Sequence, residues 1–202
     1  MLYNKSVPIS ESALIVVDAQ DSFKLGSRWE TRNNKQFETK MARLIALYRE
    51  HGLPVIFMMH SDEDEGFHTD SPEYKLMDFI VRRPSEPVFH KETRNSFTST
   101  GLGAYLLEKG VRRVAISGIS MEQCCETTTR VAADLGYKVD FVMDATVTFP
   151  IPHPTIPGRT LSVEAIEERT EYVLGGRFAT ITTVEELEAE LSRDRQPAGV
   201  GS

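Results

Sequence analysis

The sequence predicts an α/β fold, a three-layer α/β/α sandwich around a doubly wound, mostly parallel sheet of six strands. Three observations predict it. Short apolar runs alternate with longer helical patterns along the chain. The strand-like runs are continuously apolar, which is typical of strands buried on both faces of a parallel sheet. Right-handed crossovers between such strands then place helices on both faces.

The individual elements follow from local runs of the sequence. “ALIVV”, “PVIFMM”, “RRVAIS”, “KVDFVM” and “FATITT” have the apolar or β-branched character of strands, and “PVFHK” is a weaker run. The six expected strands cover residues 13–17, 54–59, 87–91, 112–117, 138–143 and 178–183. The five expected helices cover residues 35–51, 101–109, 121–135, 162–174 and 184–191.

The carboxyl ends of these strands predict where a site lies, because open α/β sheets bind ligands just outside them. Polar residues or a turn occupy most of these positions. They are Asp18, His60, Lys91, the turn at residues 118–124 and Asp144.

The chain is expected to form one domain over residues 1–202. A length of 202 residues is enough for a sizeable core. The ordered core is expected at about residues 10–194, and a flexible C-terminal tail at 195–202. The Pro-rich segment 148–160 is expected to be an ordered loop or lid, because predicted structure resumes after it.

Composition excludes several classes of partner. The net charge of −7 disfavours nucleic acid and anionic membrane surfaces, both of which need a basic face. The N-terminus lacks the apolar core of a signal peptide, and no run approaches the 18 apolar residues of a membrane span. A disulfide between two adjacent cysteines could not link distant segments of the chain. These features predict a cytoplasmic, reduced protein with no membrane or nucleic-acid partner.

The stretch “SGISMEQCCETTTR”, residues 117–130, holds both cysteines of the chain. Ser120 and Gln123 have the spacing of a capping box, which would place Cys124 in the first turn of a helix. Free backbone N–H groups and the helix dipole would lower the pKa of the Cys124 thiol there and make it a better nucleophile. The same N–H groups could hold an oxyanion. A buried, inert thiol is the alternative interpretation of Cys124.

The second cysteine is expected to be structural. A helical stripe with 4-3-4-3 spacing runs through Met121, Cys125, Thr128, Ala132 and Leu135, and would pack on the sheet. A strained vicinal disulfide between the two cysteines is a further alternative.

A nucleophilic thiol needs a base and a cation, and the strand ends offer both. Asp18 follows the most hydrophobic strand and is a candidate proton carrier. Lys91 ends the third strand and would stabilise a thiolate. His60 is the one histidine placed directly at a strand end. Alternatively, Asp18 caps a loop and Lys91 is a solvated surface residue.

Three motifs together resemble the isochorismatase-like cysteine hydrolases, which include nicotinamidases, N-carbamoylsarcosine amidase and ureidoacrylate amidohydrolase. They are “LIVVDAQDSF” at 14–23, “KETRNSF” at 91–97, and “ISGISMEQCCETTTR” at 116–130 followed by “LGYKVDFVMDA” at 135–145. The resemblance spans residues 13–183. It implies a catalytic triad of Asp18, Lys91 and Cys124. It also implies a cis peptide before Ser120, an oxyanion hole of the Ser120 and Cys124 amides, and a homodimer or homotetramer.

The sequence departs from the nicotinamidase pattern after the second strand. Nicotinamidases place an Asp and several His there to bind a metal, whereas this chain reads “HSDEDEGFH” at 60–68. The segment is therefore expected to be an acidic loop, and neither a metal nor another cofactor is expected. The side chains proposed for the substrate pocket are Gln20, Phe23, Trp29, His60, Phe97 and His153. An exposed-loop role is the alternative for Trp29.

These features predict a cysteine-dependent hydrolase of a small amide or ureido substrate, acting through a thioester. An isochorismatase-type hydrolase would cleave a vinyl ether with Asp18 and no covalent step. A haloacid-dehalogenase-type phosphatase would need D-x-D, but Asp18 and Asp21 are three residues apart. A redox or binding protein that uses the cysteine pair is the non-enzymatic alternative. The sequence does not identify the substrate.

Overall fold

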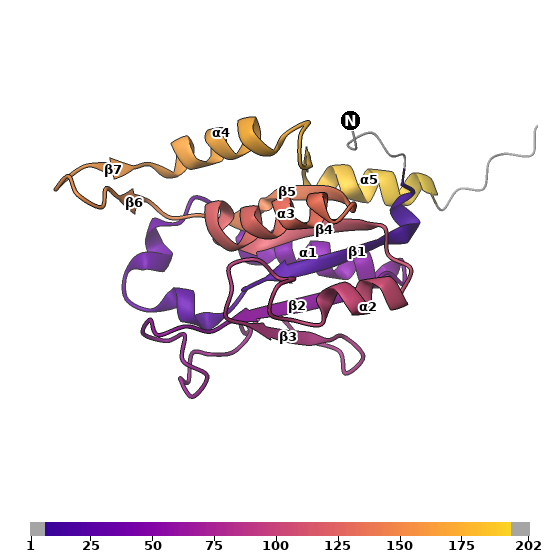
Figure 1. Ribbon diagram of the computed structural model, residues 1–202, viewed down its shortest axis with the longest axis horizontal. Coiled ribbons are helices and arrows are strands. Elements are labelled where there is room, and N and C mark those ends of the chain that lie inside the picture. Colours follow the sequence, from indigo (N-terminus) through magenta and orange to yellow (C-terminus); the bar gives the residue numbers. More distant parts are fainter. Residues whose placement is uncertain (1–6, 195–202) are drawn as a thin grey trace, which may run out of the picture.

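A computed structural model describes residues 7–194 and shows one central sheet of six parallel strands (Figure 1). The strand order is β3-β2-β1-β4-β5-β8. The predicted fold is confirmed, and the sheet is parallel throughout. The tail expected to be flexible, 195–202, lies outside the described residues. The strands are β1 (Ser12–Val17), β2 (Val55–His60), β3 (Val88–Lys91), β4 (Arg113–Ile119), β5 (Lys138–Val147) and β8 (Thr180–Thr182).

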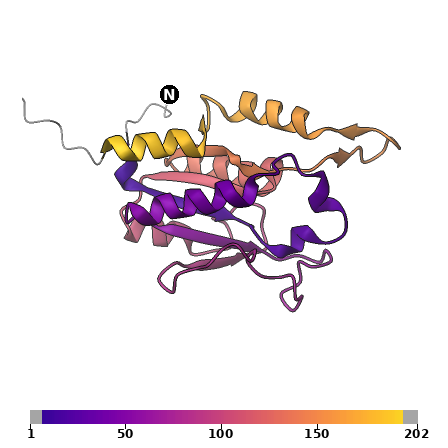
Figure 2. The same ribbon diagram turned by 180° about the vertical axis from the view of Figure 1, so that it is seen from behind.

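Helices cover both faces of the sheet, as the apolar strands require. On one face, α1 and α5 enclose an apolar core with β1 and β2, and they lie in front of the sheet in Figure 2. On the other face, α2, α3 and α4 contribute to a second apolar core. The helices are α1 (Phe37–Glu50), α2 (Leu102–Glu108), α3 (Glu126–Asp134), α4 (Val163–Leu174) and α5 (Val184–Asp194). Short helical turns are η1 (Ile9–Glu11), η2 (Asp21–Lys24), η3 (Arg28–Thr31) and η4 (Met121–Cys125). None of the helices within residues 7–194 has the length and apolarity that a membrane span requires.

The register of the central strands brings their carboxyl ends to one edge. Val17 lies opposite Gly118 in the β1–β4 pair, and His60 lies opposite Lys91 in the β2–β3 pair. Gly118 has a φ of +133°, and a Cβ at this position would overlap the carbonyl oxygen of Val17. Only glycine allows this close approach of the two strands. The loops after β3, β2, β1 and β4 therefore begin along the same edge of the sheet, in that order.

At the opposite edge, a buried guanidinium ties together the amino ends of two strands and the last helix. Arg113, the first residue of β4, is 2% exposed and contacts Asp140 of β5. It also donates two hydrogen bonds to the carboxylate of Glu190 on α5, at 2.6 and 2.8 Å. This bidentate pair fixes α5 against the start of β4.

The Pro-rich segment expected to be an ordered loop contains a small antiparallel hairpin. It is formed by β6 (Ile151–Pro152) and β7 (Thr160–Leu161), a pair that the sequence analysis did not predict. Figures 1 and 2 show this hairpin projecting past the end of the central sheet, with α4 leading back from it. Ser162 begins α4, and its hydroxyl accepts a hydrogen bond from the Ala165 amide at 3.3 Å.

Candidate active site

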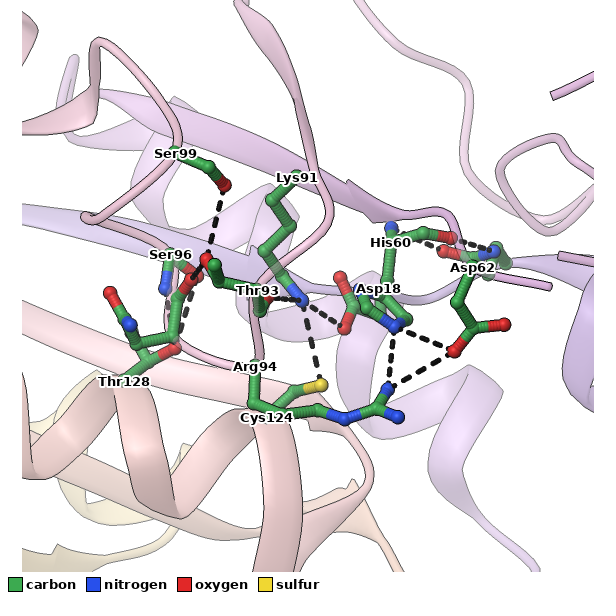
Figure 3. Close-up of polar contacts among 12 residues, drawn as sticks. Asp18, His60, Asp62, Lys91, Thr93, Arg94, Ser96, Ser99, Cys124 and Thr128 are labelled. Carbon is green, nitrogen blue, oxygen red and sulfur yellow. Dashed lines mark hydrogen bonds and ion pairs between the residues drawn. The ribbon is translucent and has the colours of Figure 1, made fainter. Parts of the chain in front are cut away.

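Three side chains from three separate strand ends meet at the carboxyl edge of the sheet (Figure 3). Lys91 Nζ donates a hydrogen bond to Asp18 Oδ2 at 2.8 Å and lies 3.4 Å from Cys124 Sγ. Its third contact is the carbonyl oxygen of Thr93, at 3.2 Å. All three side chains are buried, at 0–3% exposure. The grouping expected from the sequence is therefore present, and neither Asp18 nor Lys91 is a solvated surface residue.

Asp18 owes its position to an unusual backbone conformation. Its φ is +50°, in the left-handed region that few residues other than glycine occupy and that aspartate tolerates comparatively well. Its amide still donates to the carbonyl of Met58 on the neighbouring strand, at 3.1 Å. The chain thus turns sharply at the end of β1. Within residues 7–194, Asp18 Oδ1 is buried without a hydrogen-bond partner, so one carboxylate oxygen is left to accept a proton.

Cys124 lies in a widened helical turn, η4, rather than in the first turn of a regular α-helix. The turn follows a cis peptide between Ile119 and Ser120, as the family resemblance implies. The carbonyl of Ser120 accepts hydrogen bonds from the Gln123 and Cys125 amides, both at 3.2 Å, and the second of these spans five residues. The predicted capping box is wrong, because the Ser120 side chain makes no capping hydrogen bond.

The predicted lowering of the Cys124 pKa is also wrong. Burial, followed by the negative charge of Asp18, raises the pKa of the thiol to about 12, although the positive charge of Lys91 acts in the opposite direction. Burial also raises the pKa of Asp18 despite the neighbouring ammonium group of Lys91. The resting site therefore holds a neutral thiol beside a carboxylate that is a stronger base than an ordinary aspartate.

Cys125 faces the apolar core, as expected from the helical stripe. Met121, Cys125 and Ala132 belong to the core beside α2, and Thr128 is buried as well. Leu135 is the exception at 59% exposure, because it caps the end of α3 where the helix leaves the sheet. Both cysteines are free thiols, so the vicinal disulfide is absent from this structure.

A polar cluster that the sequence analysis did not assemble adjoins the three residues. Arg94 Nη1 lies 2.5 Å from His60 Nε2 and 3.3 Å from Asp62 Oδ2, and His60 Nε2 lies 3.0 Å from the same Asp62 oxygen. Burial lowers the pKa of His60, and the positive charge of Lys91 lowers it further. A neutral imidazole can accept a hydrogen bond from the guanidinium of Arg94. The one signal for Arg94 in the sequence was its position three residues after Lys91.

Three of the side chains proposed for a pocket, Gln20, Phe23 and Trp29, lie in the segment that follows β1 and are buried. Gln20 is buried and bridges two strand ends, because its amide group exchanges hydrogen bonds with the backbone of His60 at 2.9 and 3.0 Å. Phe23 stacks on Phe149 and meets Phe67 edge-on. Trp29 is buried at 8% exposure, so the exposed-loop alternative is wrong.

Two other proposed pocket residues point elsewhere. Phe97 stacks on Tyr137, which precedes β5 at the amino edge of the sheet, so its ring packs beside α3 and away from the site. His153 lies in the projecting hairpin, where its Nδ1 accepts hydrogen bonds from the backbone amides of Thr155 and Ile156. The expected pocket role of Phe97 and His153 stays a prediction.

The loop after β2 offers no obvious metal site in the part of the chain that the structure describes. No three His, Cys, Asp or Glu side chains within residues 7–194 converge as metal ligands would. His60 and Asp62 instead contact the guanidinium of Arg94, which already supplies a positive charge to both.

The fold and this site define a class: parallel α/β hydrolases whose reactive groups stand at the carboxyl ends of the strands. The isochorismatase domain matches the chain over residues 12–186. The chain therefore belongs to the isochorismatase family and is an isochorismatase-family hydrolase.

Individual relatives agree with this assignment. The chain is 29% identical to the isochorismatase family protein YrdC of Bacillus subtilis, over 88% of this chain and 94% of that one. It is 30% identical to Nicotinamidase 3 of Arabidopsis thaliana, over 68% of this chain and 74% of that one. A crystal structure of an isochorismatase-family protein from Chromobacterium violaceum superposes with a TM-score of 0.83 at 26% identity, covering 95% of this chain and 96% of that one.

Proposed function

We propose that the protein hydrolyses a carbon–nitrogen bond of a small amide or ureido compound, with Cys124 as nucleophile. The observation that carries the proposal is the position of Lys91 Nζ, 2.8 Å from Asp18 Oδ2 and 3.4 Å from Cys124 Sγ, in a buried cluster. A thiol, a base and a cation in contact are the parts that covalent acyl transfer requires.

In the first half of the proposed reaction, Asp18 takes the thiol proton as the sulfur attacks the carbonyl carbon. The carbonyl π electrons move to oxygen, and the backbone amides of Ser120 and Cys124 stabilise the resulting oxyanion. The raised pKa of Asp18 favours proton transfer from the thiol, and the ammonium group of Lys91 compensates the negative charge.

In the second half, the tetrahedral intermediate expels the nitrogen. The C–N bond breaks, Asp18 returns its proton to that nitrogen, and ammonia or an amine leaves behind a thioester on Cys124. Asp18 then takes a proton from water as the water oxygen attacks the thioester. The sulfur departs, recovers the proton from Asp18, and the product is the corresponding acid.

The names of relatives support a carbon–nitrogen substrate. Besides Nicotinamidase 3, they include Ureidoacrylate amidohydrolase of Variovorax paradoxus. Amide and ureido groups share a carbonyl attached to nitrogen, which the thiol of Cys124 would attack. The expected homodimer or homotetramer and the cytoplasmic location stay predictions.

A screen of small primary amides and ureas for ammonia release tests the proposal, with Cys124→Ala beside the unsubstituted protein. We expect ammonia from at least one compound, and a loss of at least about 10⁴-fold in kcat/KM in Cys124→Ala, because removing a covalent nucleophile removes the pathway. The thermal midpoint of the variant should stay within a few degrees. Undiminished ammonia release by folded Cys124→Ala would contradict the role of Cys124 as nucleophile, whereas no ammonia from any compound would favour the vinyl-ether alternative.

A further inference from the structure

Arg94 spans one side of the candidate site. The residue directly before it is Thr93, whose backbone carbonyl accepts a hydrogen bond from Lys91 Nζ at 3.2 Å. Its side chain ends at His60 Nε2, 2.5 Å away. His60 is close enough to Asp18 and Lys91 for both charges to affect its pKa. Figure 3 shows the side chain of Arg94 running past Cys124 toward His60 and Asp62. The guanidinium is thus a neighbour of the reacting groups.

Among the residues that the structure describes, only one nitrogen of this guanidinium has a polar partner. Within residues 7–194, every polar contact of the Arg94 side chain is made by Nη1, to His60 and to Asp62. In the described part of the chain, the opposite edge, formed by Nε and Nη2, has no hydrogen-bond or ion-pair partner, and the side chain is 49% exposed. That edge carries two parallel N–H donors, the arrangement that binds a carboxylate with two hydrogen bonds.

The anchoring of Nη1 holds the free edge in place. Asp62 stays ionised, because its pKa is lowered: burial raises it, but the hydrogen bond from the Asp64 amide and the positive charge of Arg94 act against burial. An ionised Asp62 and a neutral His60 fix one corner of the guanidinium, which reduces the conformational entropy that binding a ligand would cost.

We propose that Arg94 is a specificity-determining residue that binds a carboxylate of the substrate, so that the preferred substrates are amides or ureido compounds bearing an acid group. This inference rests on the proposed function for the identity of the scissile bond. The carboxylate would lie against Nε and Nη2 of Arg94, while the amide carbonyl reaches Cys124.

Acidic side chains surround Arg94, so the local net charge does not favour binding of an anion. The proposed preference for an acid group therefore depends on the directed hydrogen bonds of the guanidinium. Glu63 and Glu92 line an open hollow of about 350 Å³ together with Asp62. Both glutamates are exposed, so solvent and salt screen their repulsion of an anion. A two-hydrogen-bond contact to the fork of Arg94 is short-ranged and keeps its strength.

Binding to full-length Cys124→Ala protein tests this assignment without any turnover. Isothermal titration would compare malonamate, succinamate and glutaramate, each with its neutral diamide. In at least one pair we expect the acid to bind about tenfold or more tighter than the diamide, as a charge-assisted hydrogen bond to Arg94 would give. Arg94→Met should bring that ratio close to one, and Arg94→Lys should keep only part of it.

Arg43→Met is the matched control, since it removes a guanidinium that pairs with Glu188 on a different face of the protein. It should leave the acid-to-diamide ratio unchanged, and Glu92→Gln should raise it by less than about threefold through weaker repulsion. The ratio is measured within each variant, so partial unfolding cancels. No acid preference in any pair, or a preference that survives Arg94→Met, would overturn the assignment. Failure of the nucleophile would appear in the ammonia assay instead.

Discussion

Two buried ion pairs stand at opposite edges of the same sheet, and they differ in what surrounds the cation. At the amino edge, the guanidinium of Arg113 meets two carboxylates, those of Asp140 and Glu190. At the carboxyl edge, Lys91 meets one carboxylate, a carbonyl oxygen and the sulfur of Cys124. Burial alone does not separate them, because both cations are almost completely buried.

An unpartnered carboxylate oxygen does not separate the two sites either. Among the described residues 7–194, Oδ1 of Asp18 and Oδ1 of Asp140 both lack a partner, and burial raises the pKa of both carboxyl groups. The difference is the sulfur, because Cys124 gives the carboxyl edge a group that can form a covalent bond. We infer that the Arg113 pair holds elements together and that the Lys91 pair prepares a reaction.

The largest expected effect is on turnover at the carboxyl edge. Asp18→Asn should reduce kcat/KM for ammonia release by about 10²–10⁴-fold, because it removes the proposed general base while keeping the size of the side chain. Asp21→Asn is the matched control, since Asp21 pairs with Lys24 and Lys75 and lies outside the cluster. A decrease of similar size in both variants would count against a base role for Asp18.

At the amino edge, the expected effect is on stability. Arg113→Met should lower the free energy of unfolding by about 3–5 kcal/mol, because it leaves the buried Asp140 without its cation. Urea titration followed by circular dichroism measures the change. The fraction that remains folded should keep its kcat. Adding Asp140→Leu to Arg113→Met should restore part of the lost stability, and a further loss in the double variant would contradict this interpretation.

The pH dependence of activity sharpens the contrast on the carboxyl side. A general base must be ionised, so kcat/KM should fall as pH falls through the pKa of Asp18, by about tenfold per unit. Burial raises that pKa, so the fall should begin above the ordinary value of 3.8. A rate that stays constant down to pH 4 in folded protein would show that Asp18 is not the titrating base.

The smallest expected effect is at the second cysteine. Cys125→Ala should change kcat/KM by no more than about threefold and lower stability by about 1 kcal/mol, as a modest core truncation does. The reason is that Cys125 is fully buried among the apolar residues of the core beside α2. Ammonia release and thermal denaturation measure the two changes. A loss as large as that of Cys124→Ala would mean that the nucleophile is wrongly assigned.

The sequence was sufficient to predict the sheet and the meeting of Asp18, Lys91 and Cys124, because parallel strands place their carboxyl ends at one edge. Local spacing was a weaker guide. The capping box at Ser120 failed because the backbone there forms a wide turn after a cis peptide. Asp144 was expected just beyond a strand end, but β5 continues to Val147 after a register shift.

Side-chain direction explains the other differences. The pattern “KETRNSF” contains both Arg94 and Phe97, yet only the three-dimensional path of this loop sends the first toward His60 and the second toward Tyr137. The direction of the Cys124 pKa shift was likewise beyond the sequence. It depends on how completely the thiol is buried, and burial outweighs the attraction of Lys91.

Detection of a covalent intermediate tests the central claim most directly. A single turnover of an amide found in the ammonia screen would be quenched with acid within milliseconds and analysed by intact-protein and peptide mass spectrometry, using Cys125→Ala to leave one thiol. We predict a transient gain equal to the acyl group, mapped to Cys124 and absent from Cys124→Ala. Turnover at the full rate with Cys124 unmodified at every time point would contradict the account.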